Sequence, residues 1–216
     1  MQHNYHTKPQ AYFTNIRKDI EPLLPDFSER VLEIGCGNGA TLAHYKATTQ
    51  FAHCIGLELM PEVINPAIQI DEWLIGPVEN QLTAVPDASL DLVLCLDVLE
   101  HLLDPWAVVQ QIAEKLKPGG VLIASIPNMR TAVVLSNLLF KGQFEYANQG
   151  IMDRTHLRWF TRKSALALVS SPPFQLLSWM PSPLAKGSKS ALVNGLTLGL
   201  FRDFFTEQFL IKVQKQ

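Results

Sequence analysis

The sequence predicts a doubly wound α/β fold, and three observations lead to that prediction. Short runs rich in Val, Ile and Leu alternate with stretches of helical periodicity. Most of these runs are continuously apolar, which is typical of parallel strands buried on both faces. A glycine-rich turn follows the first run and opens a helix. We therefore expect a mostly parallel seven-stranded sheet with helices on both of its faces.

Five of the expected strands precede residue 127, and two come late in the chain. They are 31–34, 54–59, 73–75, 90–96, 121–126, 174–180 and 208–213. Helices are expected at 40–48, 62–69 (despite Pro66), 105–116, 162–170 and 191–205. Asp104 and Pro105 suit the start of the third helix, and the Pro118-Gly119-Gly120 turn its end.

The chain of 216 residues has the length of one domain with a sizeable core, and no linker divides it. We expect a single domain over residues 1–216. Within it, a cofactor half covers about 28–126, and a cover and acceptor segment covers about 127–163. The C-terminal strands cover about 172–216. The middle segment is expected to be irregular, because its regular apolar runs give way to aromatic, Arg and Asn residues.

Composition excludes several classes of protein. A hydrophobic fraction of 47% with 18% charged residues is that of a globular chain and not of a disordered one. A net charge of −2 offers no overall field for nucleic acid, and the basic group at 154–163 is expected to be a solvated face with ion pairs. No apolar run approaches the ~20 residues of a membrane span. We expect a cytoplasmic protein without nucleic-acid partners or stable membrane insertion, and no oligomeric state follows from the sequence.

The three cysteines, Cys36, Cys54 and Cys95, lie in apolar segments without CxxC spacing. They are expected to be small buried hydrophobes in a reducing compartment.

The strongest local feature is the turn that contains Gly35, Gly37 and Gly39 and follows the first strand. Its glycines let the backbone turn tightly and approach a ligand, and the helix behind it offers free N–H groups. The pattern also fits the loose dinucleotide motif. Glu33 stands two residues before the first glycine, where it would repel a pyrophosphate but attract a sulfonium or an ammonium group. Glu58 closes the second strand. A carboxylate there can accept hydrogen bonds from ribose hydroxyls, both in a dinucleotide and in a sulfonium-bearing cofactor.

Five blocks in this order make the chain resemble class I S-adenosylmethionine-dependent methyltransferases. The resemblance is to the bacterial group similar to ubiquinone-biosynthesis methyltransferases in particular, and it implies a Rossmann-like fold. The blocks are the glycine loop at 35–39, Gly56-Leu57-Glu58, 87–92, 95–101 and 116–120. The resemblance implies that S-adenosylmethionine is the cofactor. The residues expected around it are Glu33, Gly35, Cys36, Gly37, Gly39, Glu58, Leu59, Val78, Glu79, Leu96 and Asp97.

Within this set, the resemblance places Glu58 on the ribose, and Leu96 and Asp97 near the methionyl end. One position departs from the family pattern. Pro77 stands where the resemblance leads us to expect an aspartate that accepts from the adenine amine. The Val78 backbone can still bind adenine, and Glu79 or Asn80 could supply the acceptor. Otherwise the affinity for the cofactor falls by roughly 1.5–3 kcal/mol, the value of one charge-assisted hydrogen bond.

The candidates for a general base are His101 and His156, with Asp153 as an orienting partner. His101 follows the fourth strand, where the cleft of such a fold opens. His156 and Asp153 lie in a segment that mixes an acid, arginines, a histidine and aromatics. The alternative for His101 is that it packs or caps a loop. The alternative for His156 and Asp153 is a polar network that docks the cover on the sheet, in which Asp153 forms an ion pair with Arg154 or Arg158. Asn128 and the aromatic residues Phe144, Tyr146, Trp159 and Phe160 could line an acceptor pocket, although such aromatics are more often core.

No metal site is expected, because the histidines lack paired ligand spacing; Glu100 is expected only to cap or to pair. The favoured function is methyl transfer to a small molecule, such as a sugar, a lipid-linked intermediate or a quinone-like metabolite. A non-catalytic binding or scaffold protein is the alternative, favoured only by Pro77. A nicotinamide-dependent oxidoreductase is a weaker one, because Glu33 and the 118–120 turn count against it.

Overall fold

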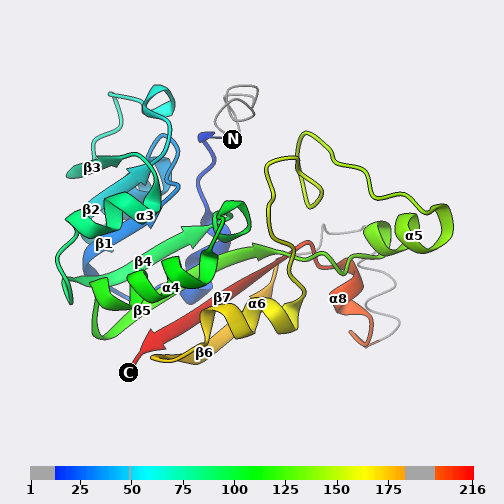
Figure 1. The fold of residues 1–216 in the computed structure, drawn as a ribbon. Helices are drawn as coiled ribbons and strands as arrows, with labels where there is room; N and C mark the ends of the chain where they lie inside the picture. The colour runs from blue at the N-terminus through cyan, green and yellow to red at the C-terminus, as the bar shows by residue number, and fades with distance from the viewer. Residues whose placement is uncertain (1–12, 49, 183–197) are drawn as a thin grey trace.

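A computed structural model describes residues 13–48, 50–182 and 198–216. It contains a seven-stranded sheet in the order β3-β2-β1-β4-β5-β7-β6 (Figure 1). The strands are β1 (Ser28–Ile34), β2 (Phe51–Glu58), β3 (Glu72–Ile75), β4 (Leu90–Leu96), β5 (Leu116–Pro127), β6 (Phe174–Pro181) and β7 (Gln208–Lys215). The seven predicted strands are confirmed, and so is the predicted fold class.

The first five strands are parallel to one another, whereas β7 is antiparallel to both β5 and β6. The order reverses between β1 and β4, so the carboxyl ends of these two strands border the crevice where doubly wound folds bind ligands. The last strand enters the sheet between β5 and β6, which closes the sheet with an antiparallel pair.

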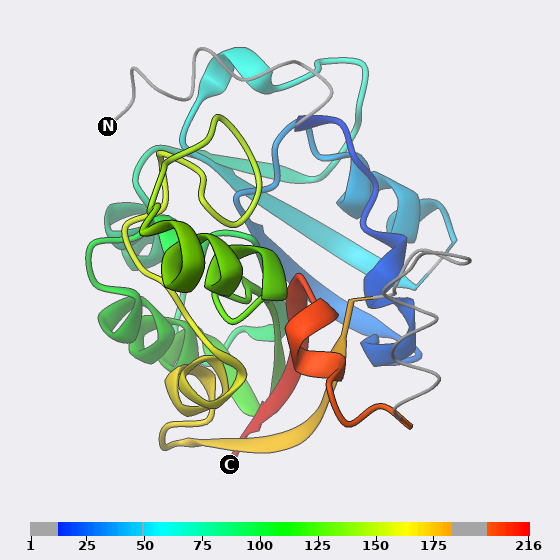
Figure 2. The same ribbon diagram turned by 90° about the vertical axis from the view of Figure 1, so that its right-hand side faces the viewer.

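Both faces of the sheet are covered (Figure 2). On one face lie α4 (Pro105–Lys115) and α6 (Arg162–Val169), against the side chains of Leu32, Val93, Leu122 and Ile211. On the other face lie α2 (Ala40–Ala47) and the 3-10 helix η2 (Lys18–Leu23), against residues that alternate with the first set, such as Val31 and Leu94. Burial on both sides explains why these strands read as continuous apolar runs.

The predicted helix at 62–69 is wrong. The chain forms only the short 3-10 helix η3 (Pro61–Val63) and then turns. Pro66 lacks an N–H group and its ring clashes with the preceding helical turn, so a helix cannot run through it. The predicted end of the helix at 105–116 is also wrong by a small margin. Leu116 already belongs to β5 and pairs with Leu90.

The cover segment (residues 127–163) is less irregular than predicted, because it contains α5 (Ala132–Lys141). This helix ends at Gly142, whose positive φ of 63° is the common left-handed C-cap. Figure 1 shows α5 projecting beyond the carboxyl ends of the strands, with the rest of the cover segment returning toward α6.

Of the predicted helix at 191–205, residues 191–197 lie outside the described residues. The described part forms only α8 (Arg202–Phe205). The remaining short elements are α3 (Val78–Gln81), η4 (Leu82–Ala84) and η5 (Leu99–His101). Within the described ranges, no helix is long and apolar enough to cross a membrane.

Candidate functional site

A cavity of about 990 Å³ opens at the carboxyl ends of β1, β2 and β4. This is the crevice that the sheet order predicts. Ten of the eleven residues expected around the cofactor line it: Glu33, Gly35, Cys36, Gly37, Glu58, Leu59, Val78, Glu79, Leu96 and Asp97. Gly39 is the exception. It precedes α2 with a φ of 83°, and a Cβ there would meet the Trp73 ring at 2.9 Å, so the turn and the packing both require glycine at this position. A contact between Gly39 and the cofactor stays a prediction.

Glu58 holds the glycine loop in shape. One carboxylate oxygen accepts the N–H of Gly37 at 2.8 Å, and the other accepts the N–H of Met60 at 3.1 Å. Burial raises the pKa of Glu58, and the two backbone hydrogen bonds oppose that rise. Each carboxylate oxygen has a further lone pair, so the group can accept from ribose hydroxyls while it keeps these bonds.

The residues before η2 form part of the cavity wall that sequence reasoning missed. Residues 13–17 all line the cavity. The carbonyl of Phe13 accepts the N–H of Asn38 at 3.1 Å, and the N–H of Arg17 donates to the Thr41 hydroxyl at 3.3 Å. Only contacts across the fold reveal this segment, because its own sequence has no distinguishing motif. We call residues 13–17 the N-terminal strap.

The strap gives Gly37 a second reason to be glycine. A Cβ on Gly37 would lie 2.6 Å from the Phe13 carbonyl oxygen, and the φ of 55° already disfavours a side chain. We expect Gly37→Ala to displace the strap and to lower stability by about 1–3 kcal/mol. At this chain length that corresponds to a fall of at least about 2 °C in Tm. Thermal unfolding would measure it.

Gly142→Ala is the matched control for this prediction. Gly142 has a similar φ of 63°, but a Cβ there would meet nothing within 4 Å. A difference between the two variants therefore reports the contact with the strap. Equal falls in Tm would show that only the backbone conformation matters.

Asp97 is fixed at the end of β4 by three donors. Its carboxylate accepts from Arg17 Nη1 at 2.6 Å, Ser125 Oγ at 2.7 Å and Gln208 Nε2 at 2.8 Å. Its φ is 59°, a conformation that Asp tolerates better than most residues. Burial opposes the charge of Arg17, but Asp19, Asp97 and Glu33 outweigh it and raise the pKa of the guanidinium. The strap therefore brings a permanent positive charge to the methionyl end of the expected site.

Glu33 lies buried in the cavity wall, and one of its oxygens has no hydrogen-bond partner among the described residues. Burial raises the pKa of Glu33 to about 8, and nearby Arg17 opposes that rise. A cationic ligand would favour the ionised form and lower this pKa. Together Glu33, Glu58 and Asp97 make a cavity that suits ammonium and sulfonium charges, while Arg17 suits a carboxylate. The residues therefore fit S-adenosylmethionine.

On the adenine side, Pro77, Val78 and Glu79 line the cavity, whereas Asn80 is not among the lining residues. Pro77 sits just before α3 with φ −59° and ψ 135°, a conformation that aspartate also adopts. Of the two substitutes suggested for the missing acceptor, Glu79 is therefore the better placed.

We expect Pro77→Asp to bind S-adenosylmethionine about 10-fold more tightly, because it adds one charge-assisted hydrogen bond. Calorimetry would measure the affinity, with Pro77→Ala as the control that removes the ring without adding an acceptor. An unchanged affinity in Pro77→Asp would indicate that Glu79 already accepts from the adenine amine.

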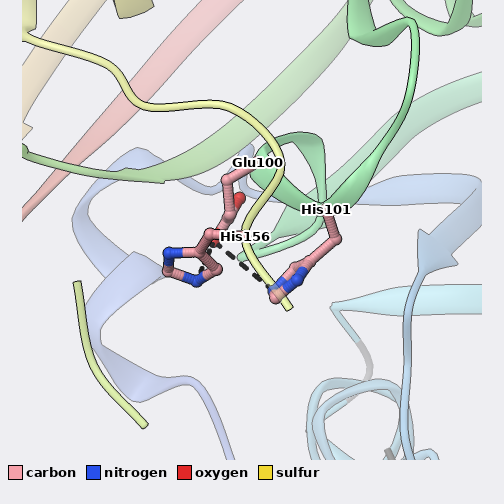
Figure 3. A group of neighbouring side chains, drawn as sticks. All are labelled: Glu100, His101 and His156. Atoms are coloured by element: carbon pink, nitrogen blue, oxygen red, sulfur yellow. Dashed lines mark ion pairs between the residues drawn. The ribbon is translucent and has the colours of Figure 1, made fainter. Parts of the chain in front are cut away.

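Of the predicted base candidates, His101 lines the cavity, whereas His156 and Asp153 are not among the lining residues. Asp153 is buried and accepts the Thr155 N–H and hydroxyl, so it shapes its own turn. His101 and His156 nevertheless lie together, with ring centroids 4.7 Å apart. Both turn toward the buried Glu100 (Figure 3), whose Oε1 is 3.9 Å from the Nε2 atom of each ring.

The ligand-type atoms of this Glu–His–His cluster lie within 4.8 Å of one another, a spacing that suits a shared proton or a metal ion. The absence of a metal site stays a prediction. From the sequence, Glu100 is expected only to cap or to pair. The sequence does not show that His156, more than fifty residues away, lies beside Glu100 and His101.

Other residues expected near an acceptor have structural contacts. Asn128 is fully buried, and its amide donates to the carbonyls of Asp203 and Thr206. Phe160 belongs to the core. Phe144, Tyr146 and Trp159 pack on one another with ring centroids 5.8–6.0 Å apart and are not among the residues that line the cavity.

Comparisons with known proteins agree with the fit of the cavity to S-adenosylmethionine. Residues 2–171 match a family model described as a methyltransferase domain. A ubiquinone biosynthesis O-methyltransferase of Xylella fastidiosa is 36% identical over 137 residues, which cover 59% of this chain and 54% of the relative. One from Xanthomonas campestris is 33% identical over 134 residues, which cover 54% of each chain. The chain thus spans about half the length of the curated relatives it matches.

Solved structures share the fold at low sequence identity. A SAM-dependent methyltransferase from Archaeoglobus fulgidus superposes with a TM-score of 0.66 at 18% identity, covering 96% of this chain and 95% of the other. An S-adenosylmethionine-dependent methyltransferase from Mesorhizobium loti gives 0.63 at 15% identity, covering 91% and 95%.

Proposed function

Because the chain belongs to the family of methyltransferase domains, with S-adenosylmethionine as the methyl donor, we propose that it methylates an oxygen atom of a small, largely apolar acceptor. The observation that carries the proposal is the wall of the cavity beyond Asp97. There Val98, His101, Leu102 and Leu103 follow one another along the lining, so an imidazole stands among apolar side chains. The relatives' name, ubiquinone biosynthesis O-methyltransferase, supports an oxygen as the acceptor atom.

The donor, when bound, supplies an electrophilic methyl carbon on a sulfonium, and the protein's task is mainly to position the partners and to exclude water. Glu58 would hold the ribose and Asp97 the methionyl ammonium, and both line the cavity. Glu33 and Arg17 set the local charge. A hydroxyl acceptor has a high pKa and must lose its proton, and His101 is the base candidate that reaches the cavity.

The proposal is tested in two steps, first on the donor and then on the acceptor. Calorimetry with S-adenosylmethionine, S-adenosylhomocysteine and NAD establishes the donor. Labelled methyl transfer to a panel of apolar molecules with and without a hydroxyl group then establishes the acceptor. Transfer confined to hydroxyl-bearing molecules supports the proposal. Donor binding with transfer only to nitrogen or carbon would overturn the choice of oxygen, and failure to bind the donor would favour the scaffold alternative.

A further inference from the structure

The buried carboxylate of Glu100 is not explained by methyl transfer. Its side chain is 1% exposed, and neither oxygen has a hydrogen-bond partner among the residues the structure describes. A buried carboxylate in this state is costly unless it carries or shares a proton or meets a cation. The imidazoles of His101 and His156 lie beside it, and the Nε2 atom of each ring is 3.9 Å from Glu100 Oε1 (Figure 3).

The hydrogen bonds of the two rings decide which nitrogen faces Glu100. His101 Nδ1 lies 3.1 Å from the Thr155 carbonyl oxygen, and His156 Nδ1 lies 2.9 Å from the Ile151 carbonyl oxygen. Carbonyl oxygens only accept, so both Nδ1 atoms carry hydrogen. Each Nε2 therefore faces the carboxylate with either a lone pair or a second proton, and one proton can be shared among the three groups.

The surrounding charges favour one shared proton. Burial and the nearby Asp97 raise the pKa of Glu100 well above its ordinary value. The other charged groups that act on it are Arg17, which opposes the rise, and Asp153, which adds to it; the buried Cys95 thiol also lies near. The two rings cannot both be cations at low cost, because their centroids are only 4.7 Å apart. With one proton the cluster is neutral, whereas with two protons or none it carries a buried net charge.

The same three residues join the cover segment to the wall of the cavity. The Glu100 carbonyl accepts the N–H groups of Leu157 at 2.8 Å and of Arg158 at 3.0 Å. The bond from His101 to Thr155 and the position of His156 beside Glu100 complete the contact. Since His101 also lines the cavity, any undocking of this part of the cover segment changes the acceptor side of the site.

We propose that Glu100, His101 and His156 form a proton-sharing latch that docks residues 151–160 on the cavity wall, and that the latch weakens on both sides of about pH 6.5. Docking by this latch does not depend on the identity of the acceptor.

The pH dependence follows from counting protons. The docked latch holds one proton. When undocked, both imidazoles titrate near about pH 6.5 and the carboxylate near about 4.3. At pH 5 the undocked state therefore holds two protons, so acid favours undocking. At pH 8 the undocked state holds almost no proton, fewer than the docked state, so high pH favours undocking as well. The undocked fraction should rise about 10-fold at either end relative to pH 6.5.

Two variants should each remove one side of this profile. Glu100→Gln leaves two neutral imidazoles in the docked state, so its latch should persist at pH 8 and still weaken at pH 5. His156→Gln leaves one proton between Glu100 and His101, so its latch should persist at pH 5 and still weaken at pH 8. Glu114→Gln, on the exposed side of α4, is the matched control and should keep the original profile.

The readout is hydrogen exchange of the Leu157 and Arg158 amides from pH 5 to pH 8, corrected for the intrinsic rate at each pH, on the protein before and after chelator treatment. A two-sided profile that becomes one-sided in opposite directions in the two variants supports the latch. Protection that does not change with pH, or that is identical in all variants, would overturn it. Protection that requires added Zn²⁺ after chelation would also overturn it, in favour of a metal site.

Discussion

Replacing Glu58 with alanine should weaken the binding of S-adenosylmethionine at least about 100-fold, because the two charge-assisted hydrogen bonds that we expect from the ribose hydroxyls to its carboxylate would each be worth about 1.5–3 kcal/mol. The loss should exceed that of the ribose contacts alone. Glu58 also accepts the N–H groups of Gly37 and Met60, so its removal leaves the glycine loop without the group that shapes it.

Glu58→Gln separates these two contributions. The amide keeps one oxygen as an acceptor but cannot accept at both backbone N–H groups, so we expect an intermediate affinity. Glu62→Ala, an exposed carboxylate four residues further along, is the control for lost charge near the site. Calorimetry on folded protein, with circular dichroism to check the fold, measures all three. An affinity within about threefold of the original in Glu58→Ala would remove Glu58 from the ribose site.

The cofactor half was predictable because its signals are local. The strands β1, β2, β4 and β5 are buried on both faces over most of their length. Glu33 and Glu58 lie at the carboxyl ends of β1 and β2, and the glycine loop follows β1 directly. The carboxyl ends of parallel strands meet at one edge, so these residues had to come together in the cavity. The same logic could not place β7 between β5 and β6, because an apolar run of that length does not specify its neighbours.

The features that the sequence does not show depend on pairs of residues far apart in the chain. Arg17 reaches Asp97 across 80 positions, and His101 reaches Thr155 across 54. Asp97 and His101 lie in a block that the sequence singles out, but nothing in the sequence pairs them with Arg17 or Thr155. The failed helix at 62–69 is a different case. Pro66 is itself a local signal in the sequence, and its missing N–H group outweighs the helical periodicity of the segment.

The strap and the latch both contact the loop after β4. Asp97 is held by Arg17 from the N-terminal strap, and three residues later Glu100 meets His156 from the cover segment. The loop after β4 therefore receives one contact from the donor side and one from the acceptor side. His101 belongs to the latch and lines the same cavity as the strap, so its position depends on the docking of the cover segment.

His101→Ala should lower kcat with a hydroxyl acceptor by about 100-fold or more, the usual effect of removing a general base. His101 is the base candidate that lines the cavity, and the Glu100 carboxylate beside its Nε2 atom would stabilise the imidazolium that forms. In the variant, hydroxide must take over the proton, so kcat should rise with pH where that of the original protein levels off. Steady-state kinetics from pH 6 to pH 9 would measure this.

The latch also contains His101, so a matched variant is needed to separate docking from catalysis. His156→Ala removes the other imidazole of the cluster without touching the cavity wall, and at pH 6.5 it should lower kcat by less than about 10-fold if only docking is disturbed. Equal losses in both variants would assign His101 to positioning, through the latch, and not to proton transfer. Full activity in both would exclude either histidine as the base and would direct attention to an acceptor whose attacking atom carries no such proton.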